Sequence, residues 1–194
     1  MSPQSEVSSP AVSASFEYSP EERRILLDLA HRSIAAEFEN SRLDLTPPSE
    51  HLAQPRGAFT TLHLNGKLRG CIGYVIVKYS LYRTVAETAQ AAAFDDPRFP
   101  PVTAEEAADL KVDISVLSPL QPIDPGLVVI GRHGLLVSQG GRRGLLLPQV
   151  PVEWGWDRET FLAQTCRKAG LQPDAWRHGA ELQAFTAEVF SDAD

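Results

Sequence analysis

Apolar residues spaced three or four positions apart mark a long helix near the start of the chain. Ser19 precedes Pro20 and two glutamates, and this order caps a helix and places negative charge in its first turn. The helical spacing continues to about Glu39. Its apolar positions are Ile25, Leu26, Leu29, Ile34 and Phe38. We therefore predict a helix over 20–39 that buries one apolar stripe and exposes its charged side.

Local signals predict a β-hairpin further along the chain. The apolar runs 57–64 and 67–77 flank Asn65-Gly66, the dipeptide most typical of a two-residue type I′ turn. A regular hairpin on this turn pairs Thr60 with Cys71 and Leu62 with Arg69. Since successive side chains alternate between the faces of a strand, the prediction places Cys71 on the same face as Arg69 and on the opposite face from His63.

The rest of the chain alternates between helical and strand-like patterns. Thr103 and Glu106 form a capping box, and prolines after residue 94 stop an alanine-rich helix. The predicted elements are helices over 81–94, 103–110 and 157–169, a strand over 111–117, an antiparallel meander of short strands at 127–130, 135–138 and 144–147, and a final strand over 181–190. Because strands outnumber the helices that could link parallel strands, we predict an α+β fold with a mostly antiparallel sheet flanked by helices.

Composition suggests how the chain is divided. Residues 1–18 are rich in serine, proline and alanine, so burial would not offset the entropy lost on ordering them, and we predict a disordered tail. The remaining residues, 19–191, are enough to bury one core, since the chain has 194 residues of which 43% are hydrophobic. We predict a single domain over this range.

Charge and cysteine content argue against several classes of function. The formal net charge of -7 lacks the positive surface that neutralises nucleic-acid phosphates, so we expect no nucleic-acid partner. The chain shows no signal-peptide pattern and no apolar run of bilayer length, which predicts a cytoplasmic protein without membrane contact. Two cysteines are too few for a disulfide framework or a four-ligand zinc site, and the histidines lack metal-ligand spacing. We expect no metal and no cofactor.

Cys71 is the residue with the most reactive chemistry in a distinctive setting. It lies between Gly70 and Gly73, where missing side chains would let a ligand or another backbone approach closely. Arg69, on the same predicted face, would favour the thiolate and raise its reactivity. Cys71 and Arg69 are therefore candidate catalytic residues. The alternative is that Cys71 packs as a small apolar side chain beneath a glycine-rich bend.

Other residues are candidates for binding a substrate. Thr60, Gly70 and Gly73 adjoin Cys71 in the predicted hairpin. Gln149 and Glu153 lie beside two tryptophans that could line a pocket with polar groups, although the tryptophans could equally cover the edge of the core.

Two further sets of residues admit more than one interpretation. The charged residues around 95–98 could grip an anion, or they could simply solvate a loop bounded by prolines. Cys166 follows Leu162 by four residues on a predicted helix, and this spacing favours core packing.

Five segments, in this order, resemble the AMMECR domain family, also called protein A of the AmmeMemoRadiSam system. These segments are Leu68–Gly73, Asp96–Phe99, Ile114–Pro119, Leu145–Gln149 and Trp156–Gly170. The resemblance covers most of residues 20–190. It implies an α+β fold with a larger lobe and a smaller lobe, and a cysteine motif near the cleft. It also implies a functional neighbourhood that contains a Memo-like protein and a radical S-adenosylmethionine enzyme.

The resemblance supplies no reaction, and two hypotheses remain. In the first, the protein is a cysteine-dependent enzyme that binds a small molecule in a cleft around Cys71, with Gln149 and Glu153 orienting it. In the second, it is a non-catalytic binding or adaptor module that works with the Memo-like protein and the radical S-adenosylmethionine enzyme.

Overall fold

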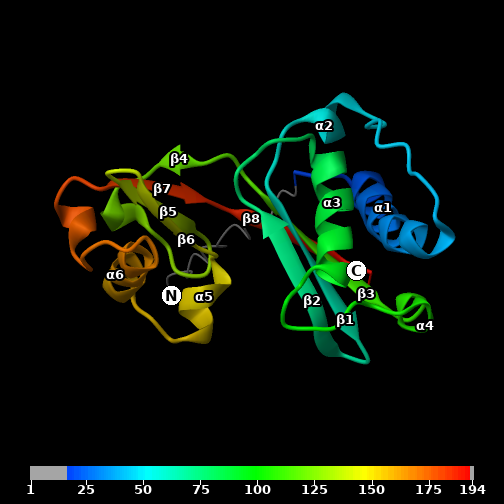
Figure 1. The fold of residues 1–194 in the computed structure, drawn as a ribbon. Helices are drawn as coiled ribbons and strands as arrows, with labels where there is room; N and C mark the ends of the chain where they lie inside the picture. Colours follow the sequence, from blue (N-terminus) through cyan, green and yellow to red (C-terminus); the bar gives the residue numbers. More distant parts are fainter. Residues whose placement is uncertain (1–16, 193–194) are drawn as a thin grey trace, which may run out of the picture.

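A computed structural model describes residues 17–192, and Figure 1 shows that they form two lobes, each containing an antiparallel sheet. The predicted α+β class is confirmed. The helices are α1 (Pro20–Glu39), α2 (Glu50–Ala53), α3 (Leu81–Phe94), α4 (Ala104–Ala107), α5 (Gln149–Glu153), α6 (Arg158–Lys168) and the 3-10 helices η1 (Pro125–Leu127) and η2 (Ala175–Arg177). The strands are β1 (Ala58–Leu64), β2 (Lys67–Tyr74), β3 (Lys111–Leu117), β4 (Gln121–Pro122), β5 (Gly134–Gln139), β6 (Arg142–Leu146), β7 (Glu181–Phe185) and β8 (Ala187–Ser191).

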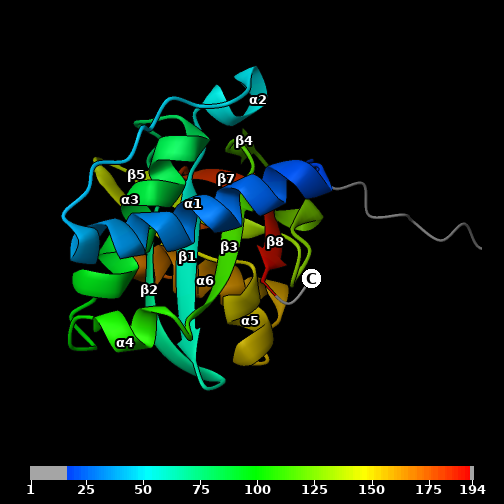
Figure 2. The same cartoon turned by 90° about the vertical axis from the view of Figure 1, so that its right-hand side faces the viewer.

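The larger lobe is a sheet with strand order β2-β1-β3-β8 and helices on one face. Alternate residues of β1 and β3, among them Leu62 and Ile114, are fully buried in the same apolar core as the stripe of α1 and the alanine-rich face of α3. Figure 2 shows α1 running across this face of the sheet. The smaller lobe lies on the side of the sheet away from α1 (Figure 1). We call the face without α1 and α3 the open face; it carries Thr61, His63 and Cys71.

The smaller lobe packs α6 against a second sheet, with strand order β4-β7-β5-β6. Phe161, Leu162 and Cys166 of α6 are buried in its core, as the helical spacing predicted for Cys166. Gly140 and Gly141, with φ of 58° and 79°, form the turn between β5 and β6.

Two predicted strands are absent or divided in the structure. The run at 127–130 is not a strand, because Asp124 accepts a hydrogen bond from the Gly126 amide and starts the 3-10 helix η1 instead. The predicted strand over 181–190 divides at Thr186 into β7 and β8, which belong to different sheets. Thr186 and Ser118 lie on the two segments that connect the lobes. The Ser118 amide donates to the Thr186 carbonyl and the Thr186 amide donates to Ser118 Oγ, each at 2.9 Å, so the two segments are joined to each other.

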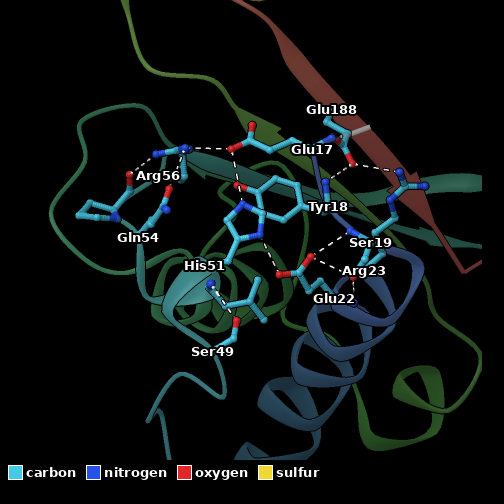
Figure 3. A network of polar contacts seen from close by, with 12 residues as sticks. Glu17, Tyr18, Ser19, Glu22, Arg23, Ser49, His51, Gln54, Arg56 and Glu188 are labelled. Atoms are coloured by element: carbon cyan, nitrogen blue, oxygen red, sulfur yellow. Dashed lines mark hydrogen bonds and ion pairs between the residues drawn. The ribbon is translucent and has the colours of Figure 1, made fainter. Parts of the chain in front are cut away.

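The beginning of the described chain is anchored in the larger lobe. The predicted tail lies mainly in residues 1–16, outside the described residues, but Tyr18 is 1% exposed and its ring stacks on that of His51 at 4.7 Å. Figure 3 shows the surrounding network, in which the Glu17 carboxylate accepts from Arg56 at 2.9 Å and Glu188 of β8 accepts from the Glu17 amide. Ordered structure therefore starts before Ser19, which caps α1 as predicted.

No helix within residues 17–192 is both long enough and apolar enough to cross a membrane.

Candidate functional site

The hairpin that carries Cys71 contains a β-bulge, which changes the predicted register. His63 pairs with Leu68 as expected, but Leu62 pairs with Gly70 and Thr61 with Cys71, so Arg69 has no partner on β1. The Asn65-Gly66 turn itself forms as predicted, with φ of 51° and 74°. The predicted pairing of Thr60 with Cys71 is therefore wrong. One extra residue on β2 moves every later side chain to the other face of the strand.

Thr60 and Gly70 consequently lie on the face covered by helices. Thr60 is fully buried, and its hydroxyl is 2.8 Å from that of Thr88 on α3. A Cβ on Gly70 would lie 2.0 Å from the carbonyl oxygen of Ala92, so the missing side chain lets α3 approach the sheet. At Thr60 and Gly70 the sheet therefore packs directly against α3.

Gly73 lies on the open face, and the space above it is occupied by an aromatic ring. A Cβ at this position would lie 2.2 Å from the ring of Phe59, its partner on β1. A surface cavity of about 520 Å³ begins at Gly73 and continues past the end of β2, where Tyr74, Lys78 and Glu87 line it. Cys71 is not among its lining residues.

Arg69 points away from the open face. Its side chain is buried, and its guanidinium is held by polar groups. Its guanidinium donates to the carbonyl oxygen of Pro100 at 2.8 Å and to the Glu106 carboxylate at 2.9 Å. This ion pair lowers the pKa of Glu106. The bulge thus attaches the segment between α3 and β3 to the sheet. The predicted position of Arg69 beside the Cys71 thiol, on the same face, is wrong because of the bulge.

Cys71 lies partly exposed on the open face, with its thiol and its backbone held by different groups. Its Sγ accepts a hydrogen bond from Thr61 Oγ1 at 3.2 Å. Its amide donates to Asp96 Oδ2 at 2.9 Å, and its carbonyl accepts from Arg98 Nη2 at 3.3 Å. Since β2 is an edge strand, the loop after α3 occupies the place that a further strand would take.

Asp96 and Arg98 form the rigid part of this loop. Asp96 is 4% exposed and accepts from the amide, Nε and Nη2 of Arg98, the last at 2.7 Å. The hydrogen bond from Arg98 holds the pKa of Asp96 far below its usual range. Asp96 in turn raises the pKa of Arg98, to which the nearby Cys71 makes a smaller contribution. The two residues anchor the backbone of Cys71, a role that the sequence analysis did not identify.

His63 and Asp113 accompany Cys71 on the open face. Asp113 on β3 pairs with Thr61, which pairs with Cys71, so these three residues form a row across the sheet. His63 Nδ1 lies 3.3 Å from Asp113 Oδ2. A regular hairpin would have placed His63 on the opposite face from Cys71, as predicted. Nothing in the hairpin's alternation indicates the bulge that brings both residues to one face.

Gln149 and Glu153 are exposed on α5 of the smaller lobe. Within the described residues no hydrogen bond or ion pair links either side chain to β2. The neighbouring tryptophans, Trp154 and Trp156, stack with ring centroids 6.1 Å apart. Among residues 17–192 there is also no group of three histidine, cysteine or acidic side chains placed to hold a metal ion.

Comparison with known proteins gives a consistent result. A model of a family described as AMMECR1 matches residues 27–190. A Thermococcus gammatolerans protein is 44% identical over 182 residues, covering 86% of this chain and 88% of its own length. The crystal structure of uncharacterized protein PH0010 from Pyrococcus horikoshii aligns with a TM-score of 0.78 at 41% identity, covering 91% of this chain and 94% of that one.

Proposed function

The chain belongs to the AMMECR1 family, and on the geometry around Cys71 we propose that it is an enzyme that uses this thiol to act on a small molecule. The single observation that carries the proposal is the contrast between the two cysteines. Cys71 is partly exposed, its Sγ accepts a hydrogen bond and its carbonyl accepts from the Arg98 guanidinium, whereas Cys166 is fully buried and burial raises the pKa of its thiol. Reactive cysteines occupy partly exposed, electropositive surroundings, while buried ones are inert.

The bulge changes which residues take part. Arg98, rather than Arg69, supplies the cation next to Cys71, and the Thr61 hydroxyl can stabilise a thiolate by donating to it. Gln149 and Glu153 remain the groups proposed to orient a substrate, because they are exposed on the lobe that lies beyond the open face (Figure 1). Two free thiols also suit the reducing cytoplasm, where we place the protein.

Intact-mass spectrometry tests the proposal. The purified protein is incubated with a library of electrophilic metabolites such as thioesters and activated esters, beside Cys71→Ser and Cys166→Ser. We expect at least one compound to add mass to the wild type and to Cys166→Ser but not to Cys71→Ser. Equal labelling of all three proteins, or labelling of none, would contradict a cysteine enzyme of this kind.

One observation favours a second function, that of an adaptor. The smaller lobe exposes large apolar side chains near α5, including Val152 at 58% and Trp154 at 70%, and the methyl of Val152 lies against the loop at Gly131. Exposed apolar residues that cluster on one surface commonly mark a protein interface. The Memo-like protein and the radical S-adenosylmethionine enzyme implied by the sequence resemblance are the proposed partners.

Calorimetry with a purified Memo-like protein and with a purified radical S-adenosylmethionine enzyme tests the adaptor. We expect Trp154→Ala to weaken binding at least tenfold, a loss typical of a central aromatic residue at an interface. Leu68→Ala changes a 42% exposed apolar residue of the other lobe and is the matched control. Absence of heat with both proteins, or equal affinity of Trp154→Ala and wild type, would exclude this surface as the interface.

A further inference from the structure

Resting on the proposed function of Cys71, we infer that His63 is its general base and that Asp113 orients His63, so that the open face carries a Cys–His–Asp site. The nucleophile, the base and the orienting carboxylate come from three adjacent strands, β2, β1 and β3. Such a constellation is recognised by the geometry and the roles of its members rather than by their order in the chain.

The backbone of Cys71 determines how closely β1 approaches it. Its amide and carbonyl both point outward to Asp96 and Arg98, so neither bonds to β1. Cys71 and Thr61 therefore form a non-hydrogen-bonded pair, the kind in which opposed Cα atoms are only about 4.5 Å apart. The contact of 3.2 Å between Thr61 Oγ1 and Cys71 Sγ agrees with this close approach.

His63 is the diagonal neighbour of Cys71 in this arrangement. It follows Thr61 by two residues on β1 and shares its face, and it pairs with Leu68 on the other side of the bulge. Diagonal neighbours on one face of a sheet lie about 7–8 Å apart at Cα, within reach of an aromatic side chain. Catalytic contacts are often long in a free enzyme and tighten when substrate binds.

The contact with Asp113 orients the imidazole of His63. Nδ1 faces Asp113 on the β3 side, at 3.3 Å. Nε2, the ring nitrogen that does not face Asp113, is then the one assigned to take the proton of Cys71. In the same way, the carboxylate of a catalytic triad selects the tautomer of its histidine and stabilises the imidazolium.

Charged groups lie on both sides of the pair. Asp113 and Lys111 of β3 lie beside His63, Lys111 being its direct partner, and Arg98 lies beside Cys71. The Asp96 charge nearest Cys71 is already neutralised by Arg98. Asp113 is therefore the carboxylate that faces the imidazole, and the Asp96–Arg98 ion pair lies beside Cys71.

The chemistry that this site supports is nucleophilic substitution by sulfur. The Cys71 S–H bond breaks, its proton moves to His63 Nε2, and the thiolate forms a bond to an electrophilic carbon of the substrate. The leaving group departs with its electron pair and takes the proton from the imidazolium. No oxidant or reductant is required, and the free site is restored when water or a second substrate displaces the sulfur with His63 again as base.

The pH profile of Cys71 alkylation tests the assignment. Iodoacetamide, which is neutral, is applied to the full chain between pH 5 and pH 10, and modification of Cys71 and of buried Cys166 is followed by peptide mass spectrometry. The variants are His63→Gln, Asp113→Asn and a matched control, His178→Gln, which removes a histidine of the smaller lobe whose distance to its aspartate, Asp174, is also 3.3 Å. Circular dichroism confirms that each variant is folded.

We expect Cys71 in His63→Gln to react about tenfold more slowly than wild type at pH 6.5, and the two rates to converge above pH 9. Asp113→Asn should slow the reaction in the same range, while His178→Gln should follow the wild type. A wild-type profile that persists in His63→Gln would overturn His63 as the base and leave the cysteine proposal standing. If Cys71 reacts no faster than Cys166 in the wild type, the proposed function itself fails.

Discussion

At the scale of single residues, the position of Cys71 depends on a buried carboxylate from a different part of the chain. Asp96 accepts the outward amide of Cys71, and Arg98 neutralises its charge. The thiol itself contacts Thr61. The backbone and the side chain of Cys71 are therefore fixed by separate partners, which allows the anchoring of Cys71 to be tested apart from its reactivity.

Replacing Asp96 by asparagine should destabilise the protein by about 2 kcal/mol at pH 7, because an amide group cannot accept all the hydrogen bonds that the carboxylate receives. The folded pKa of Asp96 is depressed, so its contribution to stability is present above the unfolded value near 4 and is lost as the pH falls below it. Urea unfolding between pH 7 and pH 3 should show a smaller acid-induced loss in Asp96→Asn than in wild type. Asp95→Asn, at an exposed neighbour, is the control and should behave as wild type.

At the scale of secondary-structure elements, the bulge in β2 connects the sheet to the segment that follows α3. Arg69 bonds to Glu106 of α4 and to the carbonyl oxygens of Pro100 and Pro101. Next to it, Gly70 lets α3 touch the sheet. These contacts make the bulge favourable, and the bulge in turn determines which side chains share a face with Cys71.

Arg69→Met should lower the free energy of unfolding by about 2–3 kcal/mol, because it removes the donor from two carbonyl oxygens and the ion-pair partner from the Glu106 carboxylate. Its effect on iodoacetamide labelling of Cys71 separates two views of the site. If Arg69 only anchors α4, the labelling rate of the folded variant equals that of wild type; a marked decrease would restore the role that the sequence suggested. Arg98→Met should reduce the rate, since Arg98 bonds to the carbonyl of Cys71 and to Asp96, which holds its amide.

Alanine at Gly70 should cost more stability than alanine at Gly73. The new methyl at Gly70 would meet a backbone carbonyl of α3 at 2.0 Å, and α3 cannot move without disturbing the core. At Gly73 the methyl would meet the Phe59 side chain, which can change its rotamer on the open face. We expect about 3 kcal/mol for Gly70→Ala and about 1 kcal/mol for Gly73→Ala in urea unfolding. Equal losses would mean that α3 adjusts as readily as a side chain.

At the scale of the whole molecule, the N-terminal segment ties several elements of the larger lobe together. Tyr18 and Glu17 contact His51 of α2, Arg56 before β1 and Glu188 of β8 (Figure 3). The two lobes are joined nearby, where Thr186 bonds to Ser118. The start of the described chain and its last strand are thus held in the same lobe, close to the connection with the other.

Tyr18→Phe should remove part of the alkaline sensitivity of the protein. Burial and the negative charge of Glu17 raise the pKa of Tyr18 to about 12. A raised folded pKa means that the stabilisation is complete below pH 10 and is lost as the pH rises toward 12, by roughly 2 kcal/mol. Thermal unfolding from pH 8 to pH 11 should show a smaller decrease for Tyr18→Phe than for wild type. Tyr79→Phe, outside this network, should show the wild-type decrease, and identical curves for all three proteins would contradict the prediction.

The sequence alone determined the features that depend on neighbouring residues. The Ser19 cap of α1, the Asn65-Gly66 turn, the extent of α3 and β3 and the burial of Cys166 are all confirmed. Capping, turn dihedrals and amphipathic spacing act over a few residues, so a local pattern is enough to predict them. The resemblance to the AMMECR family was equally visible in the motifs, and the family match confirms it.

Only the tertiary structure decided which faces and sheets these elements occupy. The bulge at Arg69 is stabilised by partners 31–37 residues away, and the division of the last strand at Thr186 depends on Ser118, 68 residues before it. Cys71 could be singled out from the sequence, but His63 and Asp113 could not be placed beside it. A side chain's face changes with a single inserted residue, and whether that insertion is favourable is settled by packing with distant segments, not by the alternation of the strand itself.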